Sequence, residues 1–475
     1  MIAIEKKAER KRTGTFAIIV QSNYEFREYF SDQECAFITK QIADDKQFIH
    51  INRFESHAYV IVVPPKKQYW QIKEVLRRKG ADLQRSLNTF KQQTIAISDI
   101  SGNKEFGQAV VEGVYLSSYQ FLPYFRDAEK KRNSLSSLHY FGALSELELK
   151  ESVNLWNALF QTKTLVNEPV MSLPSVRFVD EIKTIAGEKG FSATVYEKSW
   201  LEQQAMGGIL AVNKGSIDPP FFCVLEWKPE TVCNEKPIVL IGKGIMYDSG
   251  GLSLKPSSGM ETMKADMSGA AAVLGVMTAL ASNKSDKHVI ALLPVTDNRP
   301  SGNAYAPGDV VKMHNGLFVE VLNTDAEGRM LLADALSFAK QYDPKLVIDI
   351  ATLTGSANAA VGSDAAVVMG TAPAESISKL IEAGFAVHER LVQFPLWDDY
   401  AELIKSDIAD LKNVGGPLAG AITAGKFLEC FTSDYSWIHI DMAGSAYNSK
   451  GADYRGKGAT GMGVRLLYTF INDKN

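Results

Sequence analysis

Two kinds of hydrophobic pattern alternate along the chain. Short runs rich in β-branched residues predict strands at 15–21, 57–65 and 94–100, and a segment at 68–90 has apolar residues near helical spacing. The charged stretch at 126–133 lacks apolar anchors and is typical of a linker. The first part of the chain is therefore predicted to be mixed α/β.

After residue 170, nearly continuous apolar runs alternate with helical patterns. Strands that are apolar on both faces, separated by helices, indicate a mostly parallel or mixed sheet flanked by helices. In such sheets ligands bind beyond the carboxyl ends of the strands, so chemistry is expected at that edge. The predicted strands are 236–245, 288–295, 317–324, 345–355 and 436–444, and the clearest helices are 267–282 and 328–342.

A proline marks the predicted domain boundary. A helix predicted at 145–166 runs into Asn167-Glu168-Pro169, where the proline disfavours helical backbone in the residue before it. The chain is accordingly expected to form a smaller N-terminal α/β domain with a linker helix (1–165) and a larger α/β domain (166–475).

The composition is that of an ordinary soluble protein. With 475 residues, 45% of them hydrophobic and 22% charged, the chain is neither collagen-like nor disordered. Four cysteines form no CxxC pair, which excludes a cysteine zinc ribbon and favours a reducing compartment. No signal-peptide core follows the charged N-terminus, and the longest mainly apolar stretch, 269–281, is too short to span a membrane. We expect a soluble, cytoplasmic protein with no membrane partner.

The net charge of −4 is unevenly distributed. Residues 1–150 hold 23 Lys and Arg against 18 Asp and Glu, a balance of +5, so the remainder holds 28 against 37, a balance of −9. The basic part leaves nucleic-acid binding open as a second activity, although no nucleic-acid-binding motif accompanies it and a solvated surface is the favoured interpretation. The acidic excess of the residues after 150 indicates a function if some of their carboxylates gather around a metal ion.

Four acidic residues stand where predicted strands end or helices begin. Asp248 follows the strand at 236–245, Asp266 precedes a helix, and Asp325 and Glu327 lie between a strand and a helix. Side chains at i and i+2 of an extended segment project to the same side, so Asp325 and Glu327 can hold one ligand together. Carboxylates gathered at one point repel unless cations neutralise them, and hard divalent cations take oxygen ligands. The alternative is that these residues only cap helix N-termini.

Two lysines, Lys243 and Lys255, flank Asp248 within one glycine-rich loop. They can be ordinary salt-bridge partners, or one can lose its proton beside a divalent metal and ligate while the other keeps its charge and polarises a carbonyl. None of the seven histidines lies in an HExxH motif, and there is no GxSxG motif. A zincin is therefore excluded and a Ser-His-Asp hydrolase is disfavoured.

A series of motifs runs in order along the larger predicted domain: IGKGIMYDSGGLSLKP (241–256), MKADMSGAAAV (263–273), SGNAYAPGD (301–309), NTDAEGR (323–329) with LLADAL after it, ATLTG (351–355), PLW (395–397) and HIDMAG (439–444). In these motifs and in their order the domain resembles the M17 leucyl aminopeptidases. The resemblance covers 165–475, whereas the N-terminal part is only loosely similar. Met246-Tyr247 replaces a more usual Thr-Phe pair before Asp248.

That resemblance implies a two-metal exopeptidase that removes the N-terminal residue from peptides. Carried over by motif, the tighter metal site would comprise Lys243, Asp248, Asp266 and Glu327, with the lysine as a neutral amine. The more exchangeable site would comprise Asp248, Asp325 and Glu327, with the Asp325 backbone carbonyl also ligating. Zinc is the family's usual metal, with manganese or magnesium tolerated at the looser site.

The same resemblance implies the catalytic and substrate-binding residues. Lys255 would stabilise the oxyanion that develops during hydrolysis, and Arg329 would hold a bicarbonate that acts as general base. A pocket with Met and Leu in its wall would favour Leu or Met at the N-terminus of the peptide. The residues implied for substrate binding are Met263, Asn323, Thr352, Leu353 and Gly355.

Peptide substrates and self-association as a homohexamer are the partners that the resemblance implies. Two alternatives stay open. One is a dipeptidase, such as one acting on cysteinylglycine, because the metal core would be the same. The other is a protein that keeps the fold but binds nucleic acid.

Overall fold

The structure is a computed structural model that describes residues 2–8, 14–65, 67–432, 434–451 and 453–473. The chain forms two compact units. Unit 1 comprises 1–160 and 450–457, and unit 2 comprises 161–449 and 458–475. The division falls inside α5 (Glu146–Asn167), a few residues before the boundary that the sequence predicts.

Unit 1 is built on a six-stranded sheet with the strand order β1-β6-β5-β2-β4-β3. The three predicted β-rich runs form β2, β4 and β5, and the predicted helix at 68–90 forms α2. The charged stretch at 126–133 contains one short helix, α4. The elements are β1 (Ala3–Lys6), β2 (Phe16–Val20), α1 (Asp32–Ala43), β3 (Phe48–Asn52), β4 (His57–Val62), α2 (Tyr69–Thr89), β5 (Thr94–Asp99), α3 (Lys104–Leu116), α4 (Ala128–Lys131), β6 (Ser137–Phe141) and most of α5.

Unit 2 is built on a larger mixed sheet, as predicted. Its main path runs β16-β15-β18-β14-β9-β11-β8-β7, and β10 pairs with β11. Strands β18, β14, β9 and β11 are parallel neighbours. Strand β8 runs antiparallel to β11 and β7, and β15 runs antiparallel to β18 but parallel to β16. These strands are β7 (Ser192–Tyr196), β8 (Phe221–Trp227), β9 (Ile238–Gly242), β10 (Gly244–Asp248), β11 (Val289–Asn298), β14 (Leu346–Ala351), β15 (Ala366–Gly370), β16 (Leu391–Gln393) and β18 (Trp437–Asp441).

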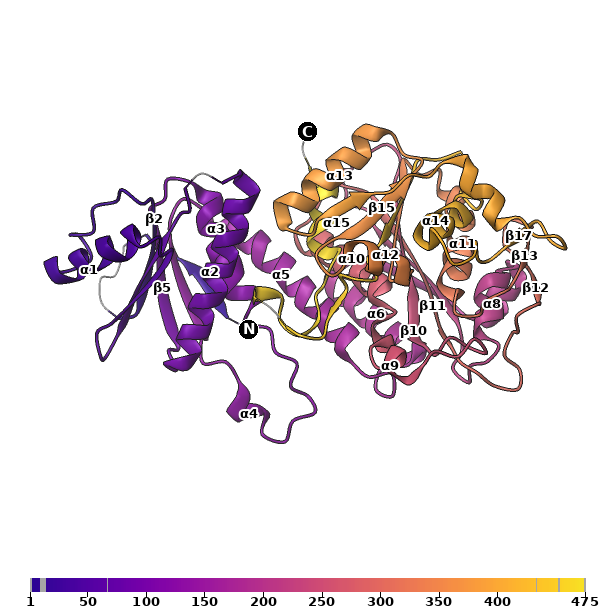
Figure 1. Ribbon diagram of the computed structural model, residues 1–475, viewed down its shortest axis with the longest axis horizontal. Coiled ribbons are helices and arrows are strands. Elements are labelled where there is room, and N and C mark those ends of the chain that lie inside the picture. The colour runs from indigo at the N-terminus through magenta and orange to yellow at the C-terminus, as the bar shows by residue number, and fades with distance from the viewer. Residues whose placement is uncertain (1, 9–13, 66, 433, 452, 474–475) are drawn as a thin grey trace. The chain divides into compact units, whose positions relative to one another are not determined.

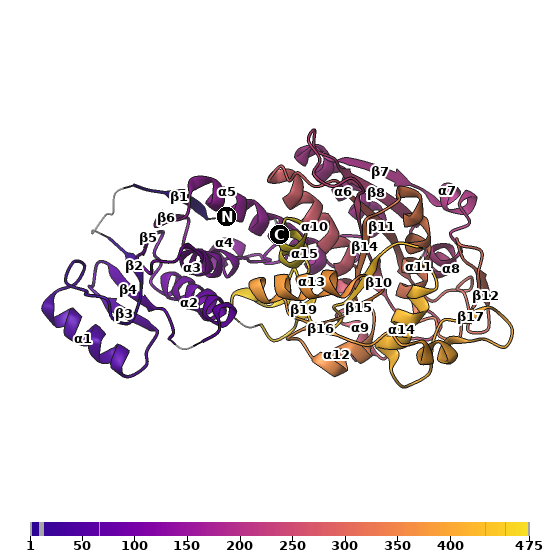
Figure 2. The same cartoon turned by 90° about the horizontal axis from the view of Figure 1, so that it is seen from above.

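Helices cover both faces of this sheet, which is why its central strands are apolar throughout. Alternate side chains of a strand point to opposite faces. In β9, Leu240 packs in the core beside α6, α10, α13 and α15, whereas Val239 and Ile241 pack in the core beside α7, α8, α11 and α14. Figures 1 and 2 show the sheet running between these two groups of helices. The helices are α6 (Ser175–Lys189), α7 (Lys198–Gln203), α8 (Gly207–Asn213), α10 (Ser268–Ser282), α11 (Glu327–Ala339), α13 (Ala374–Val387), α14 (Gly420–Glu429) and α15 (Val464–Ile471).

Two predicted strands differ from those in the structure. The run at 236–245 is not one strand, because Lys243 separates β9, which pairs with both β11 and β14, from β10, which continues beside β11. The run at 317–324 shrinks to β13 (Phe318–Glu320) and lies outside the main sheet, beside β12 (Val310–Lys312) and β17 (Leu411–Lys412). The side chains of Phe318 and Leu322 are exposed to solvent, whereas a central strand is buried on both faces.

One helical stretch, Ser257–Ser282, has the length and hydropathy of a membrane span. It joins α9 (Ser257–Met260), a 3-10 turn at Met263–Ala265 and α10. Because 94% of its most apolar window is buried inside the structure, it has the character of a core helix.

The close approach of α10 to the sheet leads to a stability prediction. A Cβ at Gly269 would lie 2.2 Å from the carbonyl oxygen of Ile350 and 2.8 Å from the backbone nitrogen of Lys243. Gly269→Ala must therefore displace the helix, and we expect it to lower the free energy of unfolding by about 1–3 kcal/mol. The control is Gly187→Ala in α6, where a Cβ meets nothing within 4 Å and a gain of about 0.4–1 kcal/mol is expected. Denaturant unfolding measures both, and equal stability of the two variants would contradict the prediction.

Candidate active site

A cavity of about 410 Å³ opens where the parallel strands of unit 2 end. Lys243 follows β9, Thr352 follows β14, and Asp248 is the last residue of β10. Residues before α10 and at the start of α11 close the cavity from the side. The structure brings all of the predicted site residues to this one cavity: Lys243, Asp248, Lys255, Met263, Asp266, Asn323, Asp325, Glu327, Arg329, Thr352, Leu353 and Gly355.

Acidic side chains from three separate segments meet at its base. Asp248, Asp325 and Glu327 each offer an oxygen within 4.8 Å of the other two. Asp248 and Glu327 are 2% and 1% exposed, so water screens their mutual repulsion poorly. The carboxylate of Asp266 lies on the other side of Lys243 from Glu327, and its Oδ2 is buried without a hydrogen-bond partner.

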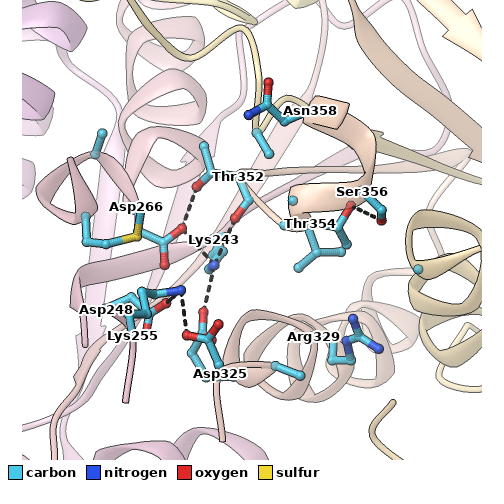
Figure 3. A pocket seen from close by; sticks show the side chains of 18 of the residues that line it. Lys243, Asp248, Lys255, Asp266, Asp325, Arg329, Thr352, Thr354, Ser356 and Asn358 are labelled. Carbon is cyan, nitrogen blue, oxygen red and sulfur yellow. Dashed lines mark hydrogen bonds and ion pairs between the residues drawn. The ribbon is translucent and has the colours of Figure 1, made fainter. Parts of the chain in front are cut away.

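Two lysines hold these carboxylates together (Figure 3). The Nζ of Lys243 lies 2.8 Å from Asp266 Oδ1 and 2.8 Å from Glu327 Oε1. The Nζ of Lys255 lies 2.8 Å from Asp248 Oδ2 and 2.5 Å from Asp325 Oδ1. Each ammonium therefore bridges two carboxylates that would otherwise face each other.

The protonation equilibria reflect this crowding. Burial, followed by the charge of Asp248, raises the pKa of Glu327 to about 8. Burial also raises the pKa of Asp266 to about 6, with the Lys243 ammonium opposing the shift. Burial lowers the pKa of Lys243, but the charges of Asp266, Glu327 and Asp248 outweigh it and raise that pKa above its usual range. The site thus holds more negative charge than two lysines compensate.

This donor set fits divalent cations. Three carboxylates within ligand distance of a common point, together with the unpartnered Asp266 Oδ2, offer the oxygen atoms that such ions bind. The same carboxylates already contact the ammonium groups of Lys243 and Lys255, so the site is one that binds positive charge.

The loop after β14 forms the upper wall of the cavity. The carbonyl oxygen of Thr352 accepts a hydrogen bond from Lys243 Nζ at 2.9 Å, and its hydroxyl donates to Asp266 Oδ1 at 2.7 Å. Asp441, at the end of β18, fixes the same loop because its carboxylate accepts from Thr354 Oγ1 at 2.6 Å and from the Leu353 backbone N–H at 3.2 Å. Asp441 belongs to the HIDMAG segment, and nothing in the sequence pattern predicts its role.

Arg329 lies across the cavity from Asp266 and apart from the lysine–carboxylate cluster (Figure 3). It is 7% exposed, and its Nη1 donates to the carbonyl oxygen of Asn413 at 2.6 Å. Among the described residues, no carboxylate lies within 4 Å of its guanidinium. Burial lowers the pKa of Arg329 to about 10, while Glu327 and Asp441 act to raise it. A buried guanidinium in such a position is suited to bind a small anion.

Further residues that no sequence pattern predicts also line the cavity. They come from within or beside the matched motifs, from α12 (Gly355–Val361) and from the segment after β17, and nothing in composition or spacing singles them out. They include Thr262, Ala265, Asn358, Val414, Ala443, Ala446 and Tyr447.

Comparison with known proteins identifies the family. The catalytic domain of the cytosol aminopeptidase family, peptidase family M17, matches residues 160–468. The chain belongs to this family. It is 44% identical over 370 residues to a probable cytosol aminopeptidase of Geotalea uraniireducens, covering 76% of this chain and 74% of that protein. It is 42% identical over 417 residues to one of Syntrophotalea carbinolica, covering 84% and 82%.

Solved structures agree in fold with this M17 chain. A mutant of tomato leucine aminopeptidase superposes with a TM-score of 0.87 and 27% identity, covering 99% of this chain and 96% of that one. The bottromycin maturation enzyme BotP in complex with Mn superposes with a TM-score of 0.85 and 28% identity, covering 96% and 98%. Family membership makes the chain a peptidase and implies divalent metal ions.

The crowding of carboxylates predicts a pH-dependent stability of the metal-free protein. The pKa of Glu327 is about 8 in the folded protein against an ordinary value of 4.5, so the folded state keeps a proton that the unfolded state releases. The stability this contributes is complete below pH 4.5 and is lost as the pH rises through 8. Glu327→Gln should therefore raise the melting temperature in chelator at pH 8.5 and change it much less at pH 5. An equal effect at both values would contradict the assignment.

Proposed function

We propose that this protein is a two-metal leucyl aminopeptidase that removes the N-terminal residue from peptides, with a preference for Leu-like and Met-like side chains. The observation that carries the proposal is the convergence of Asp248, Asp325 and Glu327 on one point, with Asp266 and Lys243 beside them. Helix capping alone does not account for this convergence, because Asp248 ends a strand.

The residues assigned to the two metals are those that the motifs imply. Lys243, Asp248, Asp266 and Glu327 would hold the tighter ion, and Asp248, Asp325 and Glu327 the more exchangeable one. When bound, zinc at the tighter site, with manganese or magnesium at the other, would supply the Lewis acidity that activates water near neutral pH. Lys243 would ligate through Nζ as a neutral amine after losing its proton, a loss that a neighbouring cation favours.

Lys255 is proposed to stabilise the oxyanion. Its side chain is partly buried at the cavity wall, and although burial lowers its pKa, Asp248 and Asp325 raise that pKa above the usual range. The ammonium therefore stays charged at neutral pH. A fixed positive charge stabilises the tetrahedral oxyanion more than the neutral carbonyl of the peptide, and that difference lowers the barrier.

Arg329 is proposed to hold bicarbonate. The planar guanidinium cannot accept a proton, but it can present parallel N–H groups to an oxyanion. Bicarbonate would serve as the proton acceptor during attack on the peptide. The hydrogen bond from Arg329 to the Asn413 carbonyl fixes the guanidinium at the cavity wall.

The substrate preference is proposed from the cavity wall. Met263, Thr352, Leu353 and Gly355 line it, and Asn323 lies at the base of the loop that carries Asp325. A flexible thioether beside apolar side chains accommodates unbranched and γ-branched side chains.

The proposal also includes a cytoplasmic location and assembly as a homohexamer. The description of the relatives as cytosol aminopeptidases supports the location. Light scattering of the purified protein tests the assembly.

Catalysis gives the direct test. Purified protein with added zinc or manganese is expected to hydrolyse leucine p-nitroanilide, and a chelator is expected to abolish the activity reversibly. N-acetylated leucine p-nitroanilide serves as the control, since an aminopeptidase leaves it intact. A panel of dipeptides and longer peptides separates a dipeptidase from an aminopeptidase. Absence of turnover with zinc, manganese and magnesium would refute the proposal.

Lys255 offers a sharper test of the oxyanion role. We expect Lys255→Met to lower kcat by about 100-fold to 1000-fold at saturating metal, with little change in KM, because the lost charge acts mainly in the transition state. The matched control is Lys236→Met, since Lys236 forms an exposed ion pair with Asp343 at 2.8 Å. A rise in KM with unchanged kcat would show that Lys255 binds the ground state instead.

A further inference from the structure

The carbonyl oxygen of Thr324 is the acceptor of two hydrogen bonds from buried side chains. The hydroxyl of Tyr305 donates to it at 2.9 Å, and Asn298 Nδ2 donates to it at 3.0 Å. Thr324 and Asn298 are 0% exposed and Tyr305 is 1% exposed. This carbonyl belongs to the peptide that joins Thr324 to Asp325, so both donors fix the backbone that carries Asp325.

Asn298 also holds Asp248. The same Nδ2 donates to Asp248 Oδ1 at 2.8 Å, where the backbone N–H of Gly250 donates as well, at 2.8 Å. Both partners of the Asn298 amide are acceptors, so the nitrogen and not the oxygen must face them. One buried amide group therefore joins the strand end that carries Asp248 to the loop that carries Asp325.

The segment that follows Asp248 packs closely against Thr324 and the Asn298 amide. The hydroxyl of Thr324 donates to the Gly250 carbonyl at 2.6 Å and accepts from the Ser253 backbone N–H at 2.8 Å. A Cβ at Gly251 would lie 2.8 Å from Asn298 Oδ1 and 3.0 Å from Thr324 Oγ1. The hydrogen bonds that Asn298 and Tyr305 donate to the Thr324 carbonyl therefore act on a close-packed part of the backbone.

We propose that Asn298 and Tyr305 are positioning residues that set the spacing between the Asp248 carboxylate and the Thr324–Asp325 backbone for cation binding. The inference rests on the proposed function, since it concerns the same metal centre. Neither side chain lines the cavity, so neither touches metal or substrate. Tyr305 belongs to the SGNAYAPGD segment, and Asn298 lies just before it.

Matched variants separate this role from general stability. Tyr305→Phe removes one hydroxyl, and Tyr435→Phe removes a hydroxyl that donates to the Leu336 carbonyl at 2.7 Å, away from the cavity. Asn298→Ala is matched by Asn213→Ala, because Asn213 Nδ2 also bridges two acceptors, the Asp218 carbonyl at 2.8 Å and Thr296 Oγ1 at 3.0 Å.

The metal-free full chain is titrated with Mn²⁺ by calorimetry, and each variant is also unfolded thermally in chelator. Groups that orient metal ligands typically change metal affinity by about 10-fold to 100-fold when removed. We expect that loss for Asn298→Ala, a loss nearer 10-fold for Tyr305→Phe, and wild-type affinity for both controls. The Mn²⁺ concentration needed for half-maximal peptidase activity should rise in parallel, with kcat approaching the wild-type value at saturation.

The outcomes distinguish this inference from the proposed function. If the wild-type protein binds Mn²⁺ and both test variants bind it as tightly as their controls, the positioning role is wrong and the aminopeptidase proposal stands. If the wild-type protein binds no Mn²⁺, the same titration is made with Zn²⁺, and binding of neither ion refutes both proposals together. Should Asn298→Ala not fold, the comparison of Tyr305→Phe with Tyr435→Phe decides alone, because each loses only one hydroxyl.

Discussion

Repulsion among buried carboxylates is the constraint on which this structure depends. Asp248, Asp325 and Glu327 offer oxygens within 4.8 Å of one another, and Asp248 and Glu327 are almost fully buried. At such distances and in low dielectric, like charges oppose folding by several kcal/mol unless positive charge or protons compensate them. In the absence of metal, Lys243 and Lys255 supply part of that positive charge, and a raised pKa at Glu327 supplies a proton.

The mixed sheet makes the convergence possible. Parallel strands end at the same edge, so Thr352, which follows β14, lies beside Lys243 after β9 and Asp248 at the end of β10, although it is distant from both in sequence. The break between β9 and β10 at Lys243 contributes to this convergence, because the pairing with β14 ends there and the lysine faces Asp266 and Glu327. The layered core on both faces keeps this edge rigid.

The sequence predicted the layers of the fold well and the details at the site less well. Continuous apolar runs such as 288–295 and 436–444 correspond to β11 and β18 because burial on both faces leaves a clear signal. The prediction of a main-sheet strand at 317–324 was wrong, because apolar residues on a small exposed sheet give the same local pattern as a buried strand. The site residues could be predicted because they lie in recognisable motifs, and the structure places them in one cavity. Asn298 lies outside the motifs and Asp441 lies in one without an implied role, since a buried amide or carboxylate that orients a neighbour is defined by its contacts and not by its spacing.

The glycine of the NTDAEGR segment shows how closely sequence and site are joined. A Cβ at residue 328 would lie 2.5 Å from Lys243 Cε and 2.7 Å from its Nζ, so only glycine leaves room for the lysine to reach Glu327. Gly250 has φ +87°, and a Cβ there would approach Asp325 Oδ1 to 2.9 Å. Both glycines therefore reserve the space that charged groups occupy. The pattern of acids and glycines in these loops follows from one requirement, namely that carboxylates and a lysine approach within contact distance in a buried place.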